Sequence, residues 1–160
     1  MCHISSVNRA FPIVRWGDED VTFDIECSES LAPLVVVLVW VAGGFALANI
    51  QGRGWCTPSG RVEKNESHLQ AAFRETREET GIELDDLERL GCFRFSDAAG
   101  SESHVPAYLG VGAATGIPCG TDSIGASVVS MEELPERYYR WDALLHEVFN
   151  YAACRVPKSQ

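Results

Sequence analysis

Three glutamates on one predicted helix are the residues of this sequence best suited to do chemistry. Glu75, Glu78 and Glu79 are spaced three and four residues apart, so their side chains share one face of a helix. Their like charges repel, and the negative end of the helix dipole disfavours anions there as well. A divalent cation would reverse both effects, because hard ions such as Mg²⁺ bind carboxylates and substrate phosphates. On spacing alone, a solvated acidic helix with Arg74 and Arg77 as partners stays open.

The residues around these glutamates indicate where the helix begins and ends. Thr57-Pro58-Ser59-Gly60 is typical of a turn. Ser67 and Gln70 match a capping box, and Gly81 suits the left-handed position that follows a helix. The predicted buried face consists of positions at three- and four-residue spacing: Leu69, Ala72, Phe73, Thr76 and Thr80.

Residues 60–82 resemble the Nudix box, G-x5-E-x7-R-E-U-x-E-E-x-G-U, in which U is apolar. Gly60, Glu66 and the run from Arg74 to Ile82 stand at the spacings of this signature, and Thr76 at a U position is the one soft departure. The resemblance implies an α/β fold, an α/β/α sandwich around a mixed sheet. It also favours a single Nudix domain over residues 1–160, with 1–18 and 156–160 as candidates for flexible ends.

The resemblance further implies a role for each box residue. A bound Mg²⁺ or Mn²⁺ would have as ligands three carboxylates and one backbone carbonyl: Glu75, Glu78, Glu79 and Ser59. Ser59 stands where the family usually has glycine. The residues with an implied structural role are Gly60, Glu66, Arg74 and Gly81. The general base in the family is a box glutamate or an acid of a later loop, so the candidates are Glu78, Glu79 and Asp122, the last with a solvated loop acid as its alternative.

Nudix proteins hydrolyse a nucleoside diphosphate linked to a group X, which implies a small nucleotide substrate. The order R-G-W-x-x-P-S-G before the box is similar to that of MutT-type pyrophosphatases. This favours a (d)NTP, or an oxidised one such as 8-oxo-dGTP, cleaved to the monophosphate and pyrophosphate. ADP-ribose, dinucleoside polyphosphates and a non-catalytic nucleotide sensor stay open, although a silent module is expected to have lost the box glutamates. Arg53 is predicted to reach a phosphate, and Trp55 to lie beside a base or in the core; the alternative for both is a flexible connection.

The elements that must position these residues follow from periodicity. The uncharged stretch 31–50 is nearly long enough to span a membrane, but its β-branched residues and Gly43-Gly44 favour a buried hairpin of strands 34–41 and 45–50. We predict further strands at 21–27, 90–95, 105–111 and 124–129, an acidic linker at 83–88, a long loop at 112–123 and an amphipathic helix at 141–152.

Composition restricts the partners and the compartment. The formal charge of −10 argues against a nucleic-acid polymer or an anionic membrane as partner. The six cysteines include no C-x-x-C pair, and no secretory signal precedes them. Reduced, mostly buried thiols in a cytoplasmic protein are therefore expected. The oligomeric state, monomer or homodimer, stays open.

Overall fold

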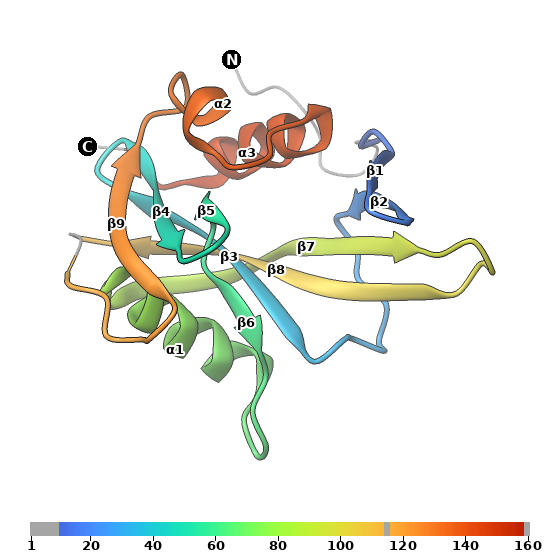
Figure 1. Ribbon diagram of the computed structural model, residues 1–160, viewed down its shortest axis with the longest axis horizontal. Helices are drawn as coiled ribbons and strands as arrows, with labels where there is room; N and C mark the ends of the chain where they lie inside the picture. Colours follow the sequence, from blue (N-terminus) through green and yellow to red (C-terminus); the bar gives the residue numbers. More distant parts are fainter. Residues whose placement is uncertain (1–9, 114–115, 159–160) are drawn as a thin grey trace.

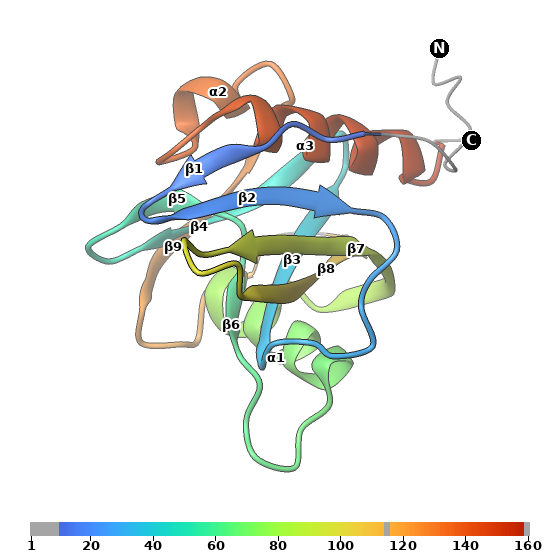
Figure 2. The same ribbon diagram turned by 90° about the vertical axis from the view of Figure 1, so that its right-hand side faces the viewer.

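A mixed sheet with helices on both faces forms the body of the protein. The computed structural model describes residues 10–113 and 116–158. Helix α1 (His68–Thr80) covers one face of the sheet, whereas α2 (Leu134–Arg137) and α3 (Ala143–Arg155) lie on the other (Figures 1 and 2). The predicted α/β architecture is confirmed.

In the described residues, nine strands form one sheet. Their bounds are β1 (Val14–Trp16), β2 (Glu19–Asp24), β3 (Leu34–Val41), β4 (Gly44–Ile50), β5 (Gly54–Cys56), β6 (Ser59–Arg61), β7 (Leu84–Ser96), β8 (Glu102–Gly112) and β9 (Ser123–Val129). The main path runs β1-β2-β7-β8-β3-β4-β5, while β6 pairs with β3 and β9 pairs with β4. The β3–β8 pair is parallel and the others are antiparallel, so the sheet is mixed.

Strand β3 divides the core into two layers. Val35, Val37 and Val39 pack on the α1 side with Ala71 and Ala72. The intervening positions face α3, because successive strand residues point to opposite faces. This two-sided burial explains the uncharged sequence of the β3–β4 hairpin. No helix within the described ranges is long and apolar enough to cross a membrane.

Helix α1 begins and ends as predicted, but its buried face is partly different. Ser67 accepts a hydrogen bond from the Gln70 backbone, the Gln70 side chain accepts one from the Ser67 N–H, and Gly81 has a φ of 73°. Leu69 and Phe73, predicted as buried, are 48% and 43% exposed, so that part of the prediction is wrong. The narrow face against the sheet is made of four small side chains: Ala71, Ala72, Thr76 and Thr80. The two threonine hydroxyls donate to carbonyls one turn earlier, which satisfies them inside the core.

The predicted acidic linker at 83–88 is also wrong, because β7 already begins at Leu84. Leu84 and Leu87 pack against the α1-side core, while Asp85, Asp86 and Glu88 are exposed. Pairing with β8 along this length outweighs the unfavourable strand propensity of the acids.

Three cysteines contradict the expectation of reduced thiols. Cys27 and Cys92 form a disulfide, with 5.5 Å between their Cα atoms, and Cys154 is also disulfide-bonded. The pairing of β2 with β7 places Asp24 opposite Cys92. Cys27 follows Asp24 by three residues, so this pairing also brings Cys27 close to Cys92. The sequence spacing could not reveal this. Reduced thiols therefore no longer support the predicted cytoplasmic location.

The ends of the chain bear on two further expectations. Strand β1 lies within the stretch predicted as a flexible end and pairs with β2. The remainder of that prediction, at 1–9 and 159–160, falls outside the described residues, as do positions 114–115 of the predicted 112–123 loop.

Candidate active site

The C-terminal half of α1 faces strand β6, and a cavity of about 480 Å³ lies between these elements and the end of β4. Its polar lining includes Arg53, Ser59, Glu79 and Asp122. We call it the carboxylate cavity. The Ser59 N–H donates to Glu79 Oε2 over 3.1 Å, so strand β6 fixes the orientation of this carboxyl group. Four residues predicted for the site are thereby brought together.

Glu79 is the acid whose protonation the fold alters most clearly. Burial, with smaller contributions from the nearby Glu75 and Asp122 carboxylates, raises the pKa of Glu79 to about 8, against the lowering effects of the Ser59 N–H and Arg53. A carboxyl group with a pKa near neutral pH can take up and release a proton under ordinary conditions. Such groups are characteristic of catalytic sites.

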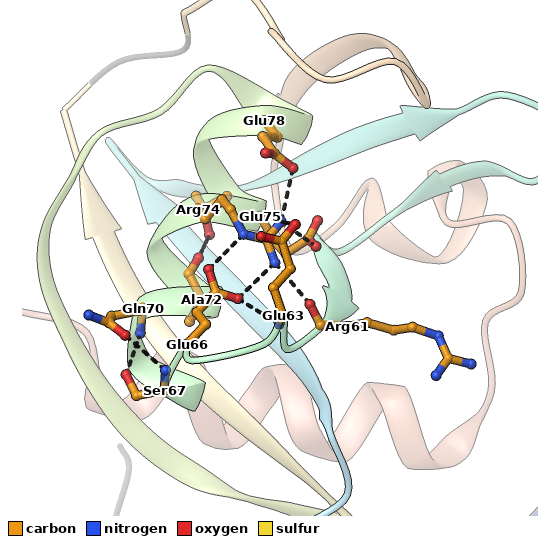
Figure 3. A network of polar contacts seen from close by, with 10 residues as sticks. Arg61, Glu63, Glu66, Ser67, Gln70, Ala72, Arg74, Glu75 and Glu78 are labelled. Carbon is orange, nitrogen blue, oxygen red and sulfur yellow. Dashed lines mark hydrogen bonds and ion pairs between the residues drawn. The ribbon is translucent and has the colours of Figure 1, made fainter.

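The other two box glutamates are held by Arg74 (Figure 3). The Arg74 guanidinium donates to Glu75 Oε1 over 2.8 Å and to Glu78 Oε2 over 3.1 Å. It also forms a two-pronged contact with Glu66, at 2.8 and 3.0 Å, and reaches the Arg61 carbonyl at 2.9 Å. Hydrogen bonding from Arg74 lowers the pKa of Glu66, whereas burial raises that of Glu75. Arg74 thus ties the loop before the helix to its carboxylate face.

Gly60 lies where there is no room for a side chain. A Cβ atom at this position would overlap the Glu75 carboxylate. At Gly81, a Cβ would overlap the backbone of residues 116 and 117, and the positive φ disfavours other residues there as well. Both box glycines therefore allow close approach between segments.

The side chains suit a hard cation by their chemistry. No three histidine, cysteine or acidic side chains of the described residues converge as they stand, because Glu75 and Glu78 are turned toward Arg74. Mg²⁺ needs only one or two protein carboxylates when substrate phosphates complete its shell. Glu79, which faces the carboxylate cavity beside Asp122, supplies an oxygen donor of that kind.

The loop before β9 completes the end of α1, a contact that the sequence did not reveal. The N–H groups of Cys119 and Gly120 donate to the Glu78 carbonyl, and Ser123 Oγ donates to the Glu79 carbonyl over 2.7 Å. These bonds satisfy carbonyls that a helix end leaves without partners. The Asp122 carbonyl accepts from the Gln51 N–H. The loop therefore places Asp122 next to Glu79.

A second cavity, of about 330 Å³, lies on the α3 side of the sheet. We call it the aromatic cavity. It shares Arg53 and Ser59 with the carboxylate cavity and extends to Trp16, Tyr139 and Arg140. The sequence alone did not single out these three residues. The only available signal was the cluster of aromatic residues and arginine at 138–141.

Trp55, predicted to contact a base, lines neither of the two cavities. The Arg137 guanidinium lies over its ring, 5.2 Å from the centroid. The backbone carbonyl of Trp55 accepts a hydrogen bond from the Tyr139 N–H over 2.9 Å. Trp55 thus supports the segment that carries Tyr139.

Comparison with known proteins shows the family and the fold. The model of the NUDIX domain matches residues 32–149. A Bacillus subtilis pyrophosphohydrolase, BsRppH, superposes with a TM-score of 0.68 at 22% identity, covering 85% of this chain and 89% of that one. A Caenorhabditis elegans Ap4A hydrolase gives a TM-score of 0.58 at 17% identity, covering 76% and 94%.

A curated relative is similar over a short stretch only. The mouse asymmetrical bis(5'-nucleosyl)-tetraphosphatase is 50% identical over 40 residues, which is 25% of this chain and 27% of the relative's length. The family match covers most of the chain. The chain therefore belongs to the Nudix family, and the predicted class of enzyme, Nudix hydrolase, is confirmed at the level of the family.

Proposed function

We propose that this protein hydrolyses a pyrophosphate linkage in a nucleoside diphosphate-X substrate with the help of Mg²⁺ or Mn²⁺. The carboxylate cavity would hold the phosphates, with a (d)NTP, unmodified or oxidised as in 8-oxo-dGTP, as the first candidate. The observation that carries the proposal is the meeting of two cavities that share Arg53 and Ser59; one is lined by carboxylate and guanidinium groups, and the other is largely aromatic. A nucleotide has a phosphate end and a base end that match these two linings.

The metal site would be completed by box residues. Glu79 faces the carboxylate cavity, and Glu75 and Glu78 would join it by giving up their contacts with Arg74. The Ser59 carbonyl remains the fourth proposed ligand. A bound Mg²⁺ would neutralise non-bridging phosphate oxygens and acidify an attacking water.

The chain's own residues would position the substrate and move a proton. The Arg53 guanidinium lies close enough to Glu79 to interact with it electrostatically, so it can face a phosphate beside that carboxylate. Glu79, held by the Ser59 N–H, would accept the proton of the water at Oε1 or Oε2. Asp122 is the second candidate for this role, because it lies in the same cavity.

One observation favours a second substrate class. The 50% identity over 40 residues is with tetraphosphatases that act on bis(5'-nucleosyl) substrates. A dinucleoside tetraphosphate would offer the same base and phosphate groups to the two cavities. Asymmetrical cleavage would then release a nucleoside triphosphate and a monophosphate.

A panel of substrates with Mg²⁺ tests the proposal. Unmodified and oxidised (d)NTPs, ADP-ribose, NADH and dinucleoside tetraphosphates are incubated with the protein, and products are separated by ion-exchange chromatography. We expect Mg²⁺-dependent turnover of at least one, lost in Glu78→Gln and kept in Glu83→Gln, a matched change at an exposed residue just beyond the helix. No product from any substrate would overturn the proposal in favour of a nucleotide sensor.

A further inference from the structure

The aromatic cavity carries a second inference, because the side chains that line it have an unusual polar composition. Its floor is apolar and fully enclosed, with Leu38, Phe93 and Phe149 exposed by 4% or less. Its rim is formed by Trp16, which is half-buried, and by the exposed Tyr139. An apolar floor with a few polar groups at the edge, at this size, is typical of a small-molecule site.

The polar side chains of the aromatic cavity are donors or hydroxyls. No carboxylate or carboxamide occurs among the described residues that line it. The Thr57 and Tyr138 hydroxyls lie 3.1 Å apart and bond each other. Three lining groups can only donate, and one of them, the Trp16 indole N–H, is already bonded to Asp142. The free donors are therefore the guanidinium groups of Arg53 and Arg140, and they favour a ligand edge that presents acceptors.

Arg140 is held in place by aromatic rings. Its guanidinium carbon is 5.0 Å from the centre of the Trp16 ring and 5.7 Å from that of Tyr139. Within the described part of the chain, no carboxylate forms an ion pair with Arg140. Its hydrogen-bond donors are therefore not committed to an acid. Stacking fixes the plane of the guanidinium, so the direction of its donors is set before a ligand arrives.

Asp142 fixes the platform beneath Arg140. The Trp16 Nε1–H donates to Asp142 Oδ2 over 2.6 Å, which orients the indole. The other oxygen, Oδ1, accepts from the Leu145 N–H over 2.9 Å and caps α3. One carboxylate thus links the start of α3 to β1. The arrangement from helix to indole to guanidinium is preorganised.

We propose that Arg140 determines base specificity by selecting a 6-oxopurine, such as guanine, over adenine. Guanine presents O6 and N7 as adjacent acceptors, which the guanidinium fork matches with two parallel hydrogen bonds. Adenine replaces O6 with an amino donor that would face another donor. The unmodified base fits better than its 8-oxo form, in which N7 carries a hydrogen. This inference rests on the proposed function only in taking the ligand to be a nucleotide.

Binding of nucleoside monophosphates to the metal-free chain tests the inference without any hydrolysis. We expect calorimetry in EDTA to give affinities for GMP and IMP that are similar and about 10- to 100-fold above that for AMP. IMP matters because it keeps O6 and N7 but lacks the 2-amino group. 7-Deaza-GMP, which lacks N7, and 8-oxo-GMP are expected to bind more weakly than GMP.

Three variants assign the preference to the guanidinium. Arg140→Met should bind GMP and AMP equally, whereas Arg140→Lys should keep only part of the preference, since its ammonium can still donate to O6 but lacks the planar fork. Arg137→Met is the matched control: it removes an arginine that also stacks on a tryptophan but does not line the aromatic cavity, and it should keep the wild-type ratio. Circular dichroism checks that each variant is folded.

The outcomes separate this inference from the proposed function. Equal binding of GMP and AMP by the wild-type chain, an undetectable affinity for GMP, tighter binding of 8-oxo-GMP, or a preference kept by Arg140→Met would overturn it. A preference for GMP in a protein that hydrolyses nothing would leave the inference standing and end the proposed function. Equal turnover of GTP and ATP would support the proposed function and overturn the inference about Arg140.

Discussion

The carboxylate cavity and the aromatic cavity share Arg53 and Ser59 but are built in different ways. In the first, Ser59, Arg61 and Glu79 come from one short stretch of chain, in which β6 and α1 follow each other. The second collects residues from β1, β3, β7 and the segment before α3. In the proposed function, the local stretch would supply charges for the chemistry, whereas the dispersed set would supply shape and base contacts. Reaction type and specificity would then be encoded at different sequence ranges.

The largest expected effect concerns the carboxylate cavity. Glu79→Gln keeps the shape of the side chain but removes its ability to accept a proton, so we expect kcat to fall by about 10²- to 10⁴-fold. Glu83→Gln should stay near wild type. Rates are measured with the best substrate of the panel. If Glu79→Gln keeps full turnover while Asp122→Asn loses it, the proton acceptor is Asp122 instead.

How well each region could be predicted from the sequence depends on whether its residues are neighbours in the chain or are dispersed along it. The helix, its caps, the hairpin at 34–50 and the glutamate face were readable because each depends on neighbours within a few residues. Leu69 and Phe73 were misjudged because α1 contacts the sheet through small residues only. The roles assigned to Ser59, Glu75, Glu78 and Glu79 remain predictions.

The aromatic cavity was not predictable, because its residues meet only after the sheet has formed. Trp16 and Arg140 are brought together by the position of β1 beside α3, and nothing in their spacing reports it. The Cys27–Cys92 disulfide depends in the same way on the pairing of β2 with β7. Contacts of this kind require knowledge of the topology.

The next effect in size tests the network behind the carboxylates. Arg74, with a side chain only 17% exposed, holds Glu66, Glu75 and Glu78. Arg74→Met leaves these acids without their shared partner, so we expect the free energy of unfolding of the metal-free protein to fall by about 3 kcal/mol or more. Arg94→Met removes the more exposed pairs with Asp24 and Glu102 and should cost less than about 1 kcal/mol. Urea denaturation distinguishes the two, and equal losses would contradict a structural role for Arg74.

A somewhat smaller effect is expected beside the aromatic cavity. Cys92 directly precedes Phe93, which lies on the floor of that cavity. The disulfide between Cys27 and Cys92 joins residues that are 65 positions apart in the sequence. The double change Cys27→Ser and Cys92→Ser should lower the free energy of unfolding by about 2 to 4 kcal/mol, because it frees the unfolded chain. Turnover should not change. Cys119→Ser, at an exposed free thiol, should alter the free energy of unfolding by at most about 0.5 kcal/mol. A similar loss in the double variant and in Cys119→Ser would show that the disulfide adds no stability.

The smallest effect is a pH dependence confined to Glu79. Its pKa is about 8 in the folded chain and near 4.5 when unfolded, so the folded state holds the proton more tightly. The stability that this proton contributes is complete below pH 4.5 and is lost as the pH rises through 8. We expect the Tm of the metal-free protein to decline from pH 6 to 9 by more than that of Glu79→Gln. The rise in Tm given by Mg²⁺ should increase over the same interval, because the cation requires the ionised group. Parallel curves for the two proteins would exclude this titration.

The most direct test of the central claim, that the two cavities bind the two ends of one nucleotide, is a crystal structure with Mg²⁺ and a guanosine triphosphate analogue that has a methylene bridge between its α- and β-phosphates. We predict the base in the aromatic cavity, with O6 and N7 against the Arg140 guanidinium, and the phosphates between Arg53 and Glu79. A base outside the aromatic cavity, or phosphates away from Glu79, would contradict the account.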